Sequence, residues 1–223
     1  MFEEIKGIGV TQELKELKNE IDATFFRYAH LTGALELYMV ILEKPNLQKN
    51  ISKAISGTET EWKEIHRFMI INNQKVTWYP ELPVREILGH KNALLGYLYG
   101  VTLNRMIGEI DFYLTSVLKN HFGQIETSSS SWDRFIQKTK IDLLNRKHGN
   151  FVYMLLQERH KIEHNKAKID RGFLERLAKR NVKHTYIEGD SIQKSHIDVL
   201  LAKQVMREFA EGVDNEVSKH ISK

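Results

Sequence analysis

The chain has 223 residues, no cysteine, three prolines and a formal net charge of +4 at pH 7. The lack of cysteine excludes disulfides and cysteine-based zinc sites, and it fits a reducing compartment. The N-terminal residues Met1-Phe2-Glu3-Glu4 lack the basic-then-apolar pattern of a signal peptide, and no apolar run is long enough to span a bilayer. These features predict a soluble, cytoplasmic protein that does not act at a membrane.

The scarcity of proline and the many Leu, Ile and Lys residues favour helices. Thr11 is a suitable cap for a helix whose apolar residues recur at intervals of three and four until Pro45 ends it. A second long helix is predicted over 92–122, a shorter one begins with Ser131 as cap, and the last covers about 195–221. The sequence therefore predicts an all-α fold, a bundle with long antiparallel helices.

The stretch between residues 47 and 90 is less regular. Thr58 and Glu61 have the spacing of a capping box, and the apolar residues Trp62, Ile65, Phe68 and Met69 that follow predict a short helix. Residues 76–80 are expected to be extended, as a short strand or a strap across the bundle.

The chain is expected to divide into an N-terminal helical extension, residues 1–90, and a helical bundle, residues 91–223, on which the extension packs. Within the bundle, Gly189-Asp190 predicts a turn. A small β-hairpin or an extended arm is therefore expected near 182–192.

The chemically densest stretch is 155–170, LLQERHKIEHNKAKID. His160 and His164 are four residues apart, so on a helix they share a face one turn apart, and the long side chain of Arg159 can reach that face. Arginine matches phosphate with a fork of donors, and histidine exchanges protons near neutral pH. The group suits the chemistry of a phosphodiester.

Arg159-His160-Lys161-Ile162-Glu163-His164 resembles the Arg-polar-x-x-x-His signature of the HEPN superfamily. Asn165 and the later Ile169-Asp170 are similar to a form of the motif found in bacterial phage-defence and toxin proteins of that superfamily. The resemblance covers roughly the C-terminal 130 residues, including a long helix before the motif.

The resemblance implies a metal-independent endoribonuclease, without a cofactor, whose motifs face each other across the cleft of a homodimer. In this interpretation His164 is the general acid or base, Arg159 holds the scissile phosphate, His160 orients the pair and Asn165 supports it. The expected product ends in a 2′,3′-cyclic phosphate. An antitoxin or another regulatory protein is an expected partner, although Lys168 stands where some toxins of this superfamily carry a modified tyrosine.

Two acidic residues, Glu109 and Asp111, interrupt the apolar pattern of the 92–122 helix. An acid on this helix that faces the motif helix would orient Arg159 or His160. Glu109 is assigned this supporting role.

Two alternatives remain open. His160-x-x-Glu163-His164 also matches the zinc-binding pattern of inverted zinc peptidases, with Glu208, Glu211 and Glu216 as candidate third ligands. The second alternative is a non-catalytic HEPN-type module that binds RNA or another protein.

Basic charge is concentrated around the motif. Residues 134–183 contain 14 Lys and Arg against 5 Asp and Glu, a local charge of +9, which leaves −5 for the rest of the chain. Binding of a phosphate backbone requires such a concentration of charge. The residues expected to contact RNA are Lys161, Lys166, Lys168 and Arg171.

Overall fold

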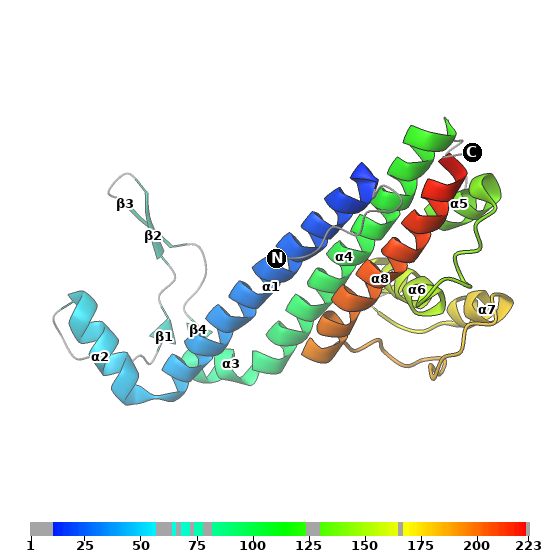
Figure 1. Ribbon diagram of the computed structural model, residues 1–223. Helices are drawn as coiled ribbons and strands as arrows, with labels where there is room; N and C mark the ends of the chain where they lie inside the picture. The colour runs from blue at the N-terminus through cyan, green and yellow to red at the C-terminus, as the bar shows by residue number, and fades with distance from the viewer. Residues whose placement is uncertain are drawn as a thin grey trace. The chain divides into compact units, whose positions relative to one another are not determined.

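The computed structural model describes residues 11–56, 64–65, 68–71, 74–77, 82–123, 130–164 and 167–221. These residues form eight helices and four short strands (Figure 1). The elements are α1 Gln12–Glu43, α2 Pro45–Ser56, β1 Glu64–Ile65, β2 Phe68–Ile71, β3 Gln74–Thr77, β4 Leu82–Pro83, α3 Val84–Gly89, α4 Lys91–Phe122, α5 Ser131–Thr139, α6 Gly149–His164, α7 Arg171–Lys179 and α8 His196–Ile221. The predicted all-α class is confirmed, and none of the helices described has an apolar stretch that could cross a membrane.

The described residues divide into two compact units. Residues 11–27 and 99–221 belong to the first unit, and residues 28–98 form the second. The helices α1 and α4 each contribute to both units, because they are continuous across this division. The predicted boundary at residue 90 does not coincide with it.

Three long helical segments lie side by side in the first unit, the start of α1, the second half of α4, and α8 (Figure 1). Contacts along α1 show that it runs antiparallel to the other two: Glu13–Asn120 and Glu20–Arg105 with α4, and Thr11–Asp214 and Asp22–Arg207 with α8. Since both neighbours oppose α1, α4 and α8 are parallel to each other.

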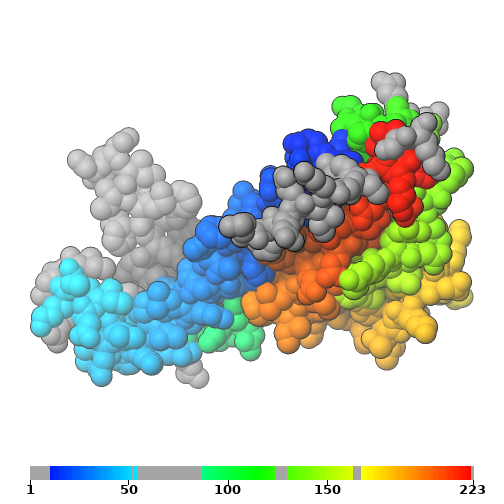
Figure 2. Space-filling view, in the orientation of Figure 1, coloured from blue at the N-terminus to red at the C-terminus, as the bar shows by residue number. Residues whose placement is uncertain are grey.

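The core of the first unit is made by the apolar faces of these helices together with α5, α6 and α7. Its largest fully buried side chains from α4 and α8 include Leu103, Met106, Ile110, Tyr113 and Phe209. The Trp132 ring of α5 stacks on the Phe209 ring at 5.6 Å between centroids. Part of α8 lies at the surface, on the face of the molecule that Figure 2 shows. The motif helix α6 is thus fixed on one side by a continuous apolar core.

Short polar side chains define where several helices begin. The hydroxyl of Thr11 accepts a hydrogen bond from the Leu14 amide at 3.2 Å, as expected for the cap of α1. For α5 the cap is Ser130, which accepts from the Asp133 amide at 3.2 Å, whereas the predicted cap, Ser131, is the first helical residue. The side chain of Ser131 is therefore available for a different contact, described below.

Asp214 joins three helices inside the first unit. Its carboxylate is 2% exposed and accepts hydrogen bonds from the Thr11 amide at 3.1 Å and from the Tyr113 hydroxyl at 3.3 Å. Replacement of Asp214 by alanine removes the acceptor of the buried Tyr113 hydroxyl and of the part-buried Thr11 amide, so we expect a loss of about 2–3 kcal/mol in the free energy of unfolding. Urea denaturation measures this loss. The neighbouring exposed residue gives the control: Asn215→Ala should change stability by less than about 0.5 kcal/mol, and an equal loss for both variants would contradict the assignment.

The second unit has a small core of its own, formed by Met39 and Leu42 of α1 and by Ile87 of α3. Its described strands form two antiparallel pairs, β1 with β4 and β2 with β3. Residues 76–77 are extended, as predicted, within β3, and the rest of the predicted segment, 78–80, lies outside the described residues. The helix predicted after Thr58 is wrong at residues 64–65 and 68–71, which are strands.

The physical reason for this difference is the composition of β2. Phe68-Met69-Ile70-Ile71 is rich in residues that favour strands, and Ile71 pairs with Gln74 across the two residues Asn72-Asn73. An apolar spacing of three is compatible with a helix, but local strand propensity prevails here.

The segment 182–192 is an extended arm without a hairpin. It pairs with the chain that follows the motif helix, because Asp190 accepts from the Ile169 amide at 2.8 Å and Gly189 donates to the Ile169 carbonyl at 2.9 Å. A single bridge joins Lys168 to Ser191. The arm thereby holds the exit of the motif helix in place.

Candidate functional site

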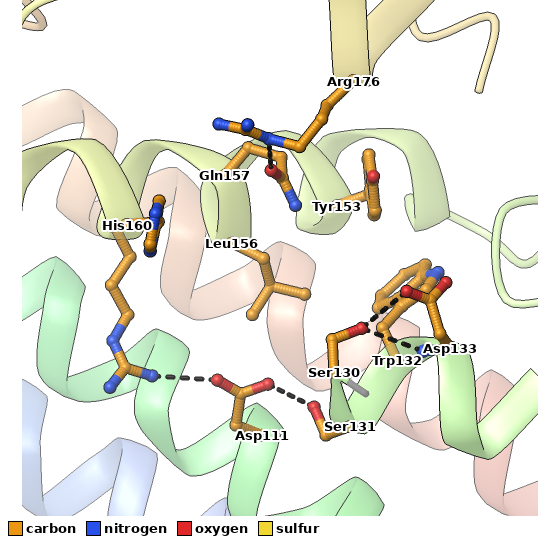
Figure 3. A pocket seen from close by; sticks show the side chains of 11 residues that line it. Asp111, Ser130, Ser131, Trp132, Asp133, Tyr153, Leu156, Gln157, His160 and Arg176 are labelled. Atoms are coloured by element: carbon orange, nitrogen blue, oxygen red, sulfur yellow. Dashed lines mark hydrogen bonds and ion pairs between the residues drawn. The ribbon is translucent and has the colours of Figure 1, made fainter. Parts of the chain in front are cut away.

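The motif helix α6 borders a pocket of about 470 Å³, named here the motif pocket. Helices α4, α5, α6 and α7 and the cap of α5 contribute its walls (Figure 3). The lining residues are Asp111, Ser130, Ser131, Trp132, Asp133, Tyr153, Leu156, Gln157, Arg159, His160 and Arg176. Two of the three predicted catalytic residues, Arg159 and His160, are therefore brought together at one pocket.

Arg159 is held by an acid from α4. Its Nη1 donates to Asp111 Oδ2 at 2.9 Å, and the other carboxylate oxygen of Asp111 accepts from the Ser131 hydroxyl at 2.5 Å. The guanidinium lies close to the backbone of Gly108, where a Cβ atom would be 3.5 Å from Nη1. Since the side chain of Arg159 remains 28% exposed, a ligand in the pocket can still reach the fixed guanidinium.

The two histidines occupy the end of α6. His160 is exposed and lines the motif pocket, and His164 is the last residue of the helix, one turn further along. The side chain of His164 lies outside the described residues, as do Asn165 and Lys166. The helical backbone from 160 to 164 nevertheless fits the spacing on which the sequence argument depends.

Asp111, rather than the predicted Glu109, orients Arg159. Glu109 is buried and pairs with Arg105 on its own helix at 2.8 Å. Two residues along a helix turn through about 200°, so positions 109 and 111 face different neighbours. Glu109 does line a second pocket, of about 600 Å³, that Arg159 also borders.

Buried charged and polar side chains attach the motif helix to the arm. Glu158 is 1% exposed, and its carboxylate contacts Lys194 and accepts from the Tyr186 hydroxyl of the arm. Burial raises the pKa of the Glu158 carboxyl, although Lys194 opposes this shift. The residue next to Arg159 in the sequence is therefore attached to the arm.

Lys161 is part of this anchoring and not of an RNA-binding surface. It is 7% exposed and pairs with Asp170, whose pKa is lowered by the hydrogen bond from the Lys161 ammonium. The prediction that Lys161 contacts RNA is thus corrected, because position 161 faces the interior of the fold. Lys168 and Arg171 are exposed, and Arg171 pairs with Glu175 at 2.9 Å.

The candidate third ligands of the zinc alternative contact cations instead. Glu208 contacts Lys147, Glu211 contacts Lys18, and Glu216 contacts Lys219 and Arg146. Among the residues described, no group of three His, Asp or Glu side chains could hold a metal ion. The side chains of Glu163 and His164 lie outside the described residues.

Glu208 gives a pH-dependent contribution to stability. Hydrogen bonds from Lys147, Gln204 and His148 lower the pKa of its carboxyl from 4.5 to about 2. A carboxyl with a lowered pKa stabilises the fold fully above its unfolded pKa and loses this contribution as the pH falls from about 4.5 through about 2. We therefore expect Glu208→Gln to be less stable than the wild type at pH 7, and this deficit to shrink as the pH falls toward about 2. Urea denaturation at both pH values measures this difference, and a deficit of the same size at both would contradict it.

Sequence reasoning did not single out Tyr153, Gln157, Trp132 or Arg176 of the motif pocket. One signal was present: Tyr153, Leu156, Gln157 and His160 have the spacing of a single helical face. His164 continues that spacing. Arg176 gave no comparable signal because its place beside α6 depends on the turn between α6 and α7.

No family model matches the chain, and no curated protein and no solved structure is significantly similar to it.

Proposed function

We propose that the protein is a metal-independent endoribonuclease of the HEPN type that acts through Arg159, His160 and His164. The observation that carries this proposal is the fixed guanidinium of Arg159, which is held by Asp111 and borders the same pocket as His160. A preorganised arginine beside a histidine is suited to a reaction in which negative charge develops on phosphate oxygens.

In the proposed reaction His164 removes the proton of a ribose 2′-hydroxyl, and the 2′-oxygen attacks the adjacent phosphorus. The bond to the 5′-oxygen breaks, and that oxygen takes up a proton from a general acid, leaving a 2′,3′-cyclic phosphate and a 5′-hydroxyl. Arg159 stabilises the charge on the non-bridging oxygens, and His160 orients the reacting groups. Asn165 supports His164.

RNA is the proposed substrate class because basic residues surround the motif. The local charge of +9 over 134–183 favours a polyanion, and the exposed side chains of Lys168 and Arg171 lie after the motif helix. Lys166 belongs to the same proposed surface. Cleavage is expected to weaken as salt rises.

A homodimer is proposed to bring two motifs together, as in the superfamily that the sequence resembles. The first unit leaves large apolar side chains exposed, among them Phe112 of α4 at 62% and Ile197 of α8 at 73%. Light scattering at micromolar concentration tests this proposal, and a monomer would contradict a site shared between two copies.

The same resemblance supports a proposed role as a cytoplasmic toxin or phage-defence effector. An antitoxin or another regulatory protein is proposed to control it.

The proposal is tested by incubating a mixed RNA pool with the purified protein in EDTA. We expect cleavage by the wild type and a reduction of about 10²–10⁴-fold in His164→Ala, the range for loss of a general acid or base. Cleavage that EDTA abolishes would favour the zinc alternative. Binding of RNA without cleavage by either protein would favour the non-catalytic module.

A further inference from the structure

We infer that the motif pocket binds one nucleotide of a single-stranded RNA, next to the scissile phosphate, with Arg176 as a ligand of the nucleotide's phosphate. The inference deepens the proposed function, on which it rests for the identity of the neighbouring phosphate. Binding at the pocket can be measured without cleavage, so the two proposals can fail separately.

The first support is an excess of hydrogen-bond donors at the pocket. Arg176 Nε donates to Gln157 Oε1 at 2.7 Å, but its Nη2 is buried and has no hydrogen-bond partner among the described residues. The same is true of the indole Nε1 of Trp132, a residue that is only 2% exposed. Buried donors are normally paired, so two unpaired donors at one pocket indicate a ligand that supplies acceptors.

The second support is that the acidic side chains of the pocket are already engaged. Asp111 accepts from Ser131 and Arg159, one at each carboxylate oxygen. Asp133 accepts from Ser130 at one oxygen and from Arg180 at the other. Both acids are thus occupied by other donors. Arg176 lies near the Asp170 carboxylate outside the pocket and donates to Gln157 within it, and its planar donors fit a phosphate group.

The third support is the size and lining of the pocket. A volume of about 470 Å³ is much larger than a phosphate group requires, and it lies within the range of sites for small organic ligands. Leu156 and Tyr153 lie along α6 between His160 and the far end of the pocket (Figure 3). These side chains offer an apolar surface for a ribose and a base, and only an unpaired base could enter such a pocket.

The position of the pocket sets the register of the substrate. His160 and Arg159 border it on α6, and Arg176 borders it from α7. A nucleotide held by Arg176 would therefore place the next phosphate of the chain near Arg159. Arg176 thereby becomes a binding residue for a phosphate, and the pocket beside it admits only a nucleotide whose base is unpaired.

The test uses a short 2′-O-methyl RNA oligonucleotide of mixed sequence, which cannot be cleaved because its 2′-oxygen is blocked. Calorimetry compares the wild type with Arg176→Met and with Lys179→Met, a control that removes the same charge from an exposed position on the same helix. We expect Arg176→Met to weaken binding about 10- to 100-fold and Lys179→Met to weaken it less than about threefold. Equal effects of the two variants, or unchanged binding by Arg176→Met, would overturn the inference, as would the absence of binding by the wild type.

A second measurement does not depend on any variant. The indole N–H signal of Trp132 in the nuclear magnetic resonance spectrum of the wild type is expected to shift when the oligonucleotide binds, and an unchanged signal would overturn the inference. If binding depends on Arg176 but unmodified RNA is not cleaved, the pocket is supported and the nuclease proposal fails. If RNA is cleaved equally well by wild type and Arg176→Met, the nuclease proposal stands and the pocket inference fails.

Discussion

Arg159→Ala is expected to reduce the rate of RNA cleavage by about 10³-fold, because it removes the preorganised donors that stabilise charge on the phosphate. The guanidinium is held by Asp111 at 2.9 Å, so it needs little reorganisation to meet the phosphate. Arg159→Lys keeps the charge but loses the planar fork, and it should recover only part of the activity. Single-turnover cleavage of a defined RNA measures all three proteins.

The matched control is Lys119→Ala, which removes a basic side chain from an exposed position on α4. This variant should cleave RNA at a rate close to that of the wild type. Asp111→Asn should lie between the control and Arg159→Ala, because Arg159 remains but is held less firmly. Wild-type rates for Arg159→Ala would refute the assignment of Arg159 to the scissile phosphate.

Gly149→Ala is expected to destabilise the protein by about 3 kcal/mol, at the upper end of the cost of overpacking. Gly149 is the first residue of α6, and a Cβ atom there would lie 2.0 Å from the Leu143 carbonyl oxygen and 2.7 Å from that of Leu144. Both contacts are with backbone atoms, so the turn before the motif helix would have to move. Urea denaturation measures the loss.

A glycine in an uncrowded position provides the control. Gly212 lies within α8, and a Cβ atom there would meet nothing within 4 Å. Gly212→Ala should therefore raise stability by up to about 1 kcal/mol, since alanine is favoured over glycine inside a helix. If Gly149→Ala were as stable as the wild type, the close approach of the turn to α6 would be wrong.

The long helices could be predicted from sequence because their signals are local. Thr11 caps α1, Pro45 follows its end, and the apolar pattern of α4 continues without a break to Phe122. The division into two units could not be predicted, because it cuts through α1 and α4 and leaves no composition change at the boundary. The strand β2 was misjudged where a helical spacing and a strand-favouring composition coincided.

Prediction of the candidate site was limited in the same way. The pairing of Arg159 with His160 follows from one helix and was visible in the sequence. The choice of Asp111 over Glu109 depends on the rotation of α4 about its axis, and the burial of Lys161 depends on the path of the chain to Asp170. Arg176 joins the pocket from α7, so its contribution is purely tertiary.

The most direct test of the proposed nuclease is an analysis of the RNA ends produced in EDTA. We predict 2′,3′-cyclic phosphate and 5′-hydroxyl ends from the wild type, and about 10²–10⁴-fold fewer of them from His164→Ala. These ends arise only if the neighbouring 2′-oxygen is the nucleophile, as the roles of His164 and Arg159 require. Products with 3′-hydroxyl and 5′-phosphate ends, or cleavage that disappears when EDTA is added, would contradict the account.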